Sequence, residues 1–133
     1  MSKPEVFVGA VIHGFGRGRK LGFPTANVMA NFAHVSSGIY SGLVTIESIR
    51  REPYGATVSI SDNPTFADVD QRVMECYMHD FNEEIYGQTV RVELISRLRD
   101  EIAFDSTEDL IEQSRRDVEE SRSRLTKYLD GAG

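Results

Sequence analysis

The chain has 133 residues, the length of one domain, and its 40% hydrophobic residues can form one compact core, which excludes general disorder. A formal net charge of −6 argues against a nucleic-acid partner, because neutralising phosphates requires a surplus of lysine and arginine. The single cysteine, Cys76, excludes an internal disulfide and a multi-cysteine metal site, and it suits a reducing compartment.

The N-terminal segment predicts a strand and no targeting signal. Residues 1–12 lack the basic start and apolar run of a secretory signal, and no apolar stretch approaches the ~20 residues that span a bilayer. We therefore expect a cytoplasmic protein without a membrane partner. Val6, Val8, Ala10 and Ile12 alternate with other residues, which predicts a first strand ending at His13.

Residues 14–22 form a stretch rich in glycine and basic residues, which predicts a loop that turns or approaches another group closely. The stretch matches neither a Walker loop nor a dinucleotide fingerprint, since Arg19 stands where the third glycine of Gly-x-Gly-x-x-Gly would be. Its backbone amides, with Arg17, Arg19 and Lys20, could bind phosphates. A flexible basic hairpin tip is an equally good interpretation.

Four further segments have strand patterns. Residues 38–49 and 54–60 predict two strands joined by a polar turn at residues 50–53. Residues 72–79 alternate, which places Met74, Cys76 and Met78 on one face and Glu75 and Tyr77 on the other. A last strand passes through residues 90–94, with Arg91 and Glu93 facing solvent. We expect Cys76 to be a buried small hydrophobe.

A helix over about residues 107–129 follows the strands. Ser106 and Asp109 resemble a weak capping box, and an apolar stripe consists of Leu110, Ile111, Val118, Leu125 and Leu129. Short strands followed by one helix predict a single domain over residues 1–133. They favour a closed antiparallel barrel, with the helix on its outside or across one end. Closure removes sheet edges, so we expect a monomer.

The stretch Gly22-Phe23-Pro24-Thr25-Ala26-Asn27 resembles the signature of the riboflavin kinase family, including the kinase module of bacterial bifunctional FAD synthetases. Similar family elements recur in order: the loop 14–22, then residues 38–40, 63–66, Glu75, 80–81, 85–87, 98–99 and 104–106. The resemblance implies a six-stranded antiparallel Greek-key β-barrel with a C-terminal amphipathic α-helix. It also implies transfer of the terminal phosphoryl group of ATP to the 5′-hydroxyl of riboflavin, which yields FMN and ADP.

The resemblance also implies roles for individual residues. Thr25 and Asn27 would bind Mg²⁺ and nucleotide phosphate, and both offer the hard oxygen ligands that Mg²⁺ prefers. Glu75 would be the general base for the riboflavin hydroxyl. A flavin flap would include Arg99 and Phe104, and a nucleotide flap would include Gly14, Gly16, Arg17 and Lys20. The histidines His13, His34 and His79 have no metal-ligand spacing and are interpreted as structural or surface residues.

The sequence departs from the family pattern at one turn. Ser61 and Asp62 follow Ile60 where the family usually has a glycine after isoleucine, and a Cβ there is expected to shift the turn that backs the flavin site. A catalytically inactive flavin- or nucleotide-binding sensor module is the alternative function, against which Thr25, Asn27 and Glu75 together argue. Use of CTP as donor is associated with another fold. A free-standing kinase, making FMN but not FAD, and an excised module of a bifunctional synthetase remain open.

Overall fold

A computed structural model describes residues 5–12, 25–30, 34–62, 72–81 and 83–129. These residues form six strands and one helix: β1 (Glu5–Ile12), β2 (Ala26–Met29), β3 (Gly38–Thr45), β4 (Tyr54–Asp62), β5 (Arg72–Met78), β6 (Thr89–Arg99) and α2 (Thr107–Leu129). No helix in the described part of the chain is long and apolar enough to cross a membrane.

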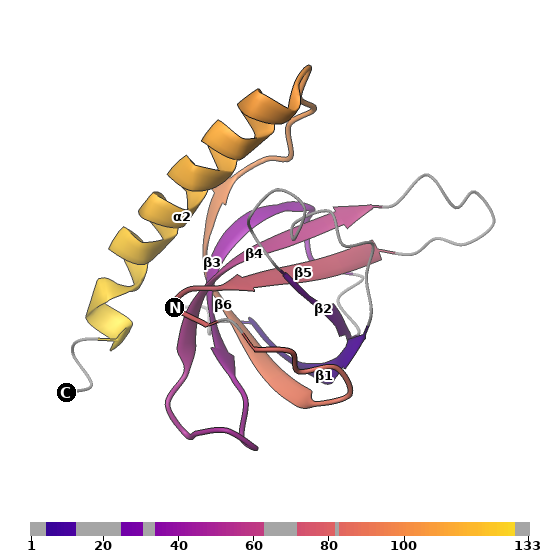
Figure 1. The fold of residues 1–133 in the computed structure, drawn as a ribbon, viewed down its shortest axis with the longest axis vertical. Coiled ribbons are helices and arrows are strands. Elements are labelled where there is room, and N and C mark those ends of the chain that lie inside the picture. The colour runs from indigo at the N-terminus through magenta and orange to yellow at the C-terminus, as the bar shows by residue number, and fades with distance from the viewer. Residues whose placement is uncertain (1–4, 13–24, 31–33, 63–71, 82, 130–133) are drawn as a thin grey trace.

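The six strands close into an antiparallel barrel (Figure 1). Around the barrel the order is β1-β2-β5-β4-β3-β6, so β3, β4 and β5 are consecutive neighbours while β6 returns beside β3. A three-strand meander flanked by a strand from a longer connection is a Greek key. The predicted six-stranded barrel with a C-terminal helix is confirmed.

One predicted strand is shorter than expected, the last one extends over Thr89–Arg99 instead of residues 90–94, and one observed strand was not predicted. The strand predicted over residues 38–49 ends at Thr45, because the backbone amides of Ile49 and Arg50 both donate to the Ile46 carbonyl and turn the chain. The four-residue strand β2, which contains Asn27, was missed as a strand. It is the strand that joins β1 to β5 and so completes the closure.

The barrel interior is filled with apolar side chains. Met74, Cys76 and Met78 point inward as their alternation predicts, and they pack with residues from every other strand. Burial, with a smaller effect from the charge of Glu75, raises the pKa of the Cys76 thiol to about 12. On β1 the inward residues are Phe7 and Val11, so the alternating set Val6 to Ile12 forms the outer face. Polar functional groups must therefore lie outside the barrel.

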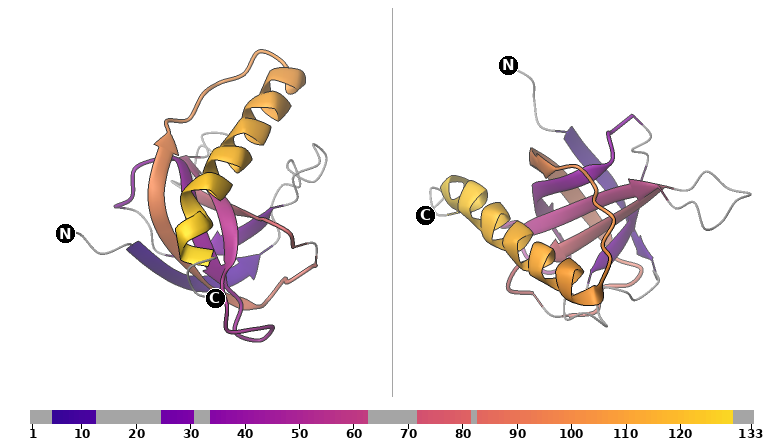
Figure 2. Two further views of the ribbon diagram at one scale, coloured as in Figure 1. Left: turned by 90° about the vertical axis from the view of Figure 1, so that its left-hand side faces the viewer. Right: turned by 90° about the horizontal axis from the view of Figure 1, so that it is seen from above.

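Helix α2 packs on the outside of the barrel, across β3, β4 and β6 (Figures 1 and 2). Its first turn is capped as expected, since the Asp109 amide donates to Ser106 Oγ at 3.1 Å. Its buried residues are Asp117, Ser121 and Leu125, which recur every four positions. The predicted apolar stripe is therefore only partly right: Leu125 is fully buried, Leu129 is 38% exposed, and two polar residues share the buried face.

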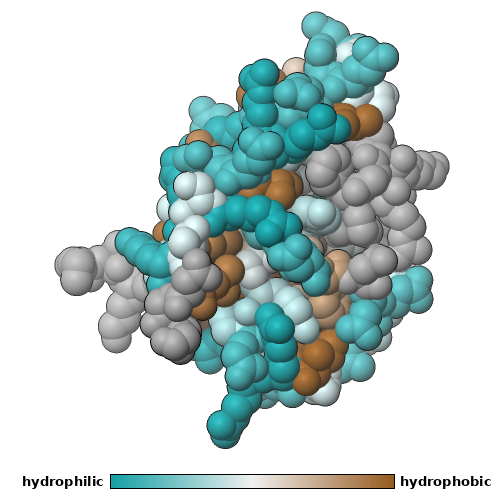
Figure 3. All heavy atoms as spheres, turned by 60° about the vertical axis from the view of Figure 1, so that its left-hand side comes forward, coloured by the Kyte–Doolittle hydropathy of each residue, from teal (hydrophilic) through white to brown (hydrophobic). Residues whose placement is uncertain are grey.

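The contact of α2 with β4 includes one hydrogen bond, and it also brings helix side chains close to Gly55. Ser121 Oγ donates to the Ala56 carbonyl at 2.9 Å. A Cβ on Gly55 would lie 3.1–3.3 Å from side-chain atoms of Leu129, His79 and Leu125, so these side chains would have to shift by a few tenths of an ångström to admit a larger residue. The outward surface of this side of the molecule is mostly hydrophilic (Figure 3).

His79 is buried beside this contact. Its backbone amide donates to the Gly55 carbonyl, and its Nε2 shares a hydrogen bond of 2.8 Å with Thr57 Oγ1. Burial, together with the nearby Arg122 guanidinium, lowers the pKa of His79 to about 4, while Asp80 opposes this shift. The imidazole is therefore neutral at neutral pH.

We expect His79 to make the fold less stable in mild acid. Because its pKa is about 4 in the folded chain and about 6.5 unfolded, the unfolded state binds more protons as pH falls through this window. Between pH 7 and pH 5 the free energy of unfolding should fall by about 1–2 kcal/mol through this group. Urea titrations of the wild type and of His79→Gln isolate the effect by difference. Equal pH slopes for both proteins would contradict the assignment.

Candidate functional site

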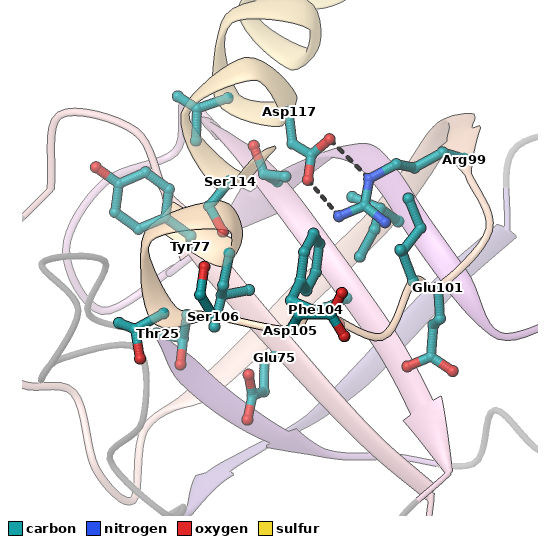
Figure 4. A pocket seen from close by; sticks show the side chains of 17 residues that line it. Thr25, Glu75, Tyr77, Arg99, Glu101, Phe104, Asp105, Ser106, Ser114 and Asp117 are labelled. Carbon is teal, nitrogen blue, oxygen red and sulfur yellow. Dashed lines mark hydrogen bonds and ion pairs between the residues drawn. The ribbon is translucent and has the colours of Figure 1, made fainter. Parts of the chain in front are cut away.

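A cavity of about 630 Å³ lies between the outer face of the barrel and the first half of α2 (Figure 4). Four of the predicted site residues, which come from four separate segments of the chain, line it: Thr25, Glu75, Arg99 and Phe104. The remaining lining residues come from β3, β4, β5, the segment 101–107 and the helix: Ile39, Thr57, Ser59, Tyr77, Glu101, Ile102, Asp105, Ser106, Thr107, Leu110, Ser114, Asp117 and Val118. The predicted residues Gly14, Gly16, Arg17 and Lys20 lie outside the described residues.

Strand register explains why the site residues meet. In antiparallel pairs, directly opposed residues point to the same face with Cβ atoms roughly 5 Å apart. The register pairs Asn27 with Glu75, Glu75 with Ser59, Ser59 with Ile39, and Ile39 with Arg99. These five residues therefore form one row across the outer face of five strands, with Glu75 beside the Asn27 end and Arg99 at the other end. We call it the transverse row.

Asn27 is the one residue of the transverse row with a buried polar atom left unsatisfied. The side chain is 8% exposed, and its Oδ1 has no hydrogen-bond partner in the described part of the chain. A buried oxygen without a partner is costly and commonly marks the place of a bound group. A neutral amide oxygen opposite the Glu75 carboxylate, with the Thr25 hydroxyl two residues earlier in the chain, suits a hard cation such as Mg²⁺, so the donor set fits the ion that the family resemblance implies.

Arg99 holds the helix over the cavity. Its Nε and Nη2 donate to the two carboxylate oxygens of Asp117 at 2.9 and 2.7 Å (Figure 4). Gln113 donates to the same carboxylate at 3.0 Å. The Arg99 and Asp117 side chains are only 18% and 8% exposed, so water screens the pair weakly. The Arg99 guanidinium also lies 6.0 Å from the Phe104 ring centroid. The guanidinium therefore joins the end of β6 to α2 and borders the aromatic side of the cavity.

Sequence reasoning missed Asp117, Ser59 and Thr57 as cavity residues. The four-residue spacing of Asp117, Ser121 and Leu125 could have revealed that the carboxylate shares the buried helix face. Strand alternation could have placed Thr57 and Ser59 on the outer face, because the intervening Val58 is fully buried. Their position next to Glu75 depends on how β4 pairs with β5, and alternation within one strand does not predict that pairing.

The fold and the cavity define a Greek-key barrel with a cavity of small-molecule size under its terminal helix. A family model described as "Flavokinase: Riboflavin kinase" matches residues 1–125. The chain therefore belongs to the riboflavin kinase family, as its motifs predict.

Relatives agree with this membership. The riboflavin kinase of Homo sapiens is 40% identical over 123 residues, which cover 88% of this chain and 78% of that protein. The bifunctional riboflavin kinase/FMN adenylyltransferase of Bacillus subtilis is 34% identical over 125 residues, covering 91% of this chain and 39% of that protein. The chain thus spans well under half of the bifunctional relative and most of the human one.

A solved structure shares the fold. The crystal structure of riboflavin kinase from Trypanosoma brucei superposes with a TM-score of 0.66 at 25% identity, covering 97% of this chain and 85% of that one.

We expect removal of Asp117 to cost more stability than removal of the whole ion pair. Asp117→Leu leaves the Arg99 guanidinium poorly solvated and without its carboxylate, which commonly costs about 3 kcal/mol or more. The double variant Arg99→Met/Asp117→Leu leaves no uncompensated charge and should be closer to the wild type. Urea unfolding of the three proteins tests this, and a double variant that is less stable than Asp117→Leu would contradict it.

Proposed function

We propose that the chain is a riboflavin kinase that transfers the terminal phosphoryl group of ATP to the 5′-hydroxyl of riboflavin, with Glu75 as general base. The observation that most supports this is the pairing of Asn27 with Glu75, which lines a cavity together with Arg99 and Phe104. Membership of the riboflavin kinase family supports the same reaction.

The proposed chemistry follows from the order of residues in the transverse row. Thr25 and Asn27 would hold Mg²⁺, which when bound neutralises charge on the nucleotide phosphates. Glu75, next in the row, accepts the proton of the riboflavin 5′-hydroxyl. The hydroxyl oxygen of riboflavin forms a bond to the terminal phosphorus of ATP as the bond between that phosphorus and ADP breaks. The carboxylate then returns the proton to solvent.

The other end of the row suits the flavin. Ile39 is buried and lies between Ser59 and Arg99 in the register, so it offers an apolar surface about two strand spacings from Glu75. Phe104, with Leu110 and Val118 of the helix, adds further apolar lining. A ring bound there lies beneath α2, which would exclude the water that competes as phosphoryl acceptor.

The proposal includes the nucleotide role of Gly14, Gly16, Arg17 and Lys20, which rests on the family resemblance. We also propose that the chain acts as a cytoplasmic monomer on small molecules, without a nucleic-acid partner. The closed barrel, which has no open sheet edge, supports the monomer, and the negative charge argues against a nucleic-acid partner.

Glu75→Gln should reduce FMN formation about 10²- to 10⁴-fold, because the amide cannot accept the hydroxyl proton. Riboflavin and ADP should still bind, since the substitution preserves shape. The assay measures FMN by chromatography after incubation with riboflavin, ATP and Mg²⁺, with a Mg²⁺-free control. Glu47→Gln, at an exposed position away from the cavity, is the matched control. Unchanged turnover in Glu75→Gln would refute the base. Binding without turnover in the wild type would instead favour an inactive sensor module.

Asn27→Leu should separate the effect of the buried amide on stability from its proposed role in binding Mg²⁺. It removes a buried unsatisfied oxygen, so the melting temperature without ligands should hold or rise. The increase in melting temperature that Mg²⁺ and ATP cause together should disappear, because ligand stabilisation scales with affinity. Asn27→Asp, which keeps an oxygen ligand, should retain the increase. The metal role is wrong if Asn27→Leu keeps the full Mg²⁺-dependent increase.

A further inference from the structure

The wall of the cavity contains two neighbouring pairs of polar side chains. The register opposes Ser59 to Glu75, and two residues further along each strand it opposes Thr57 to Tyr77. All four residues line the cavity. Residues two apart on a strand are roughly 7 Å from one another, so the Thr57–Tyr77 pair lies that distance from the proposed base, along the strand direction.

His79 contacts this second pair from the side away from Glu75. It is 5% exposed, does not line the main cavity, and borders a separate one of about 570 Å³ under the second half of α2. Its Nε2 bonds to Thr57 Oγ1 at 2.8 Å, and its ring lies 5.9 Å from the Tyr77 ring at an angle of 62°. The imidazole therefore contacts both side chains of the pair while it remains outside the cavity.

The hydrogen bond to His79 orients the Thr57 hydroxyl and leaves it able to form a further hydrogen bond. A threonine hydroxyl has one donor and two acceptor sites, and a neutral imidazole offers one donor and one acceptor. Whichever tautomer is present, the hydroxyl has capacity left for a further bond on the cavity side. Thr57 is half-buried and lines the cavity, so a ligand bound there can take that remaining bond.

We propose that Thr57 is a specificity-determining contact for the polyol chain of the acceptor, and that His79 is the positioning residue that orients it. The inference rests on the proposed function, because the acceptor considered is riboflavin. Riboflavin carries three secondary hydroxyls between the phosphorylated end and its ring. With the terminal hydroxyl at Glu75, a wall hydroxyl ~7 Å along the strands is within reach of that chain.

The test pairs a change in the protein with a change in the acceptor. The probes are riboflavin and a flavin analogue with a 5-hydroxypentyl side chain, which keeps the terminal hydroxyl and lacks the three others. Thr57→Val keeps the shape of the side chain but loses the hydroxyl. We expect it to raise KM for riboflavin about tenfold, as loss of one hydrogen bond implies, with kcat and KM for ATP unchanged. KM for the analogue should not change.

Variants of His79 test the positioning role. His79→Leu should raise KM for riboflavin as Thr57→Val does, although residue 79 does not line the main cavity. His79→Gln can place an amide nitrogen near the Nε2 position and should restore the wild-type KM. Thr89→Val, an exposed threonine away from the cavity, is the matched control and should behave as wild type. Thr57→Ala provides a second hydroxyl-deficient variant if Thr57→Val fails to fold.

The outcomes are distinguishable. Absence of FMN formation by the wild type defeats the proposed function. With wild-type turnover intact, equal effects of Thr57→Val on both acceptors, or no effect on either, overturn the specificity role. A loss of kcat and melting temperature in His79→Leu without a change in KM, or failure of His79→Gln to restore KM, overturns the positioning role.

Discussion

Apolar side chains from all six strands fill the barrel, and this constraint places the chemistry on its outer surface. A full interior has no room for a nucleotide or a flavin. Outward positions on a barrel strand ordinarily face water, where a carboxylate has little influence on a bound molecule. The terminal helix changes this, because its first half covers part of the outer face and turns an exposed row of side chains into a cavity wall.

The helix is therefore part of the site as well as part of the fold. Leu125 supplies apolar burial near its C-terminal end, while Ser121 and Asp117 each bond to one defined partner on the barrel. Apolar contact is non-directional and would tolerate sliding of the helix, whereas a hydrogen bond and a bidentate ion pair fix its position. Arg99 borders the cavity and also binds Asp117 of α2. The position of α2 and the shape of the cavity near Phe104 are therefore coupled.

The sequence predicted those features that depend on local pattern. The helix over about residues 107–129 and the inward set Met74, Cys76 and Met78 are both observed, since each follows from a periodicity within one segment. The four-residue strand β2 is too short to show a period, and it was missed although it contains Asn27. The unsatisfied oxygen of Asn27 and the Arg99–Asp117 pair depend on contacts between distant segments, which no local pattern reveals.

The roles of Thr25, Asn27 and Glu75 came from a family resemblance, and the fold gives that resemblance a physical basis. A motif of consecutive residues and a single glutamate some fifty positions later have no evident relation in sequence. The pairing of β2 with β5 sets Asn27 directly opposite Glu75. A one-residue shift in that register would turn one of the two side chains into the barrel, so the same pairing that closes the sheet also assembles the site.

The charges that line the cavity favour different substrates at the two ends of the transverse row. Among the described lining residues, the carboxylates of Glu75, Glu101, Asp105 and Asp117 outnumber the single cation, Arg99, which is bound to Asp117. Such a surface suits an uncharged acceptor far better than a triphosphate. An anionic donor would have to bring a divalent cation to the Asn27 end, where a neutral amide oxygen is available and no second carboxylate opposes Glu75 in the register. The acceptor can then occupy the apolar end near Ile39 and Phe104 without meeting the phosphates except at the one hydroxyl beside Glu75.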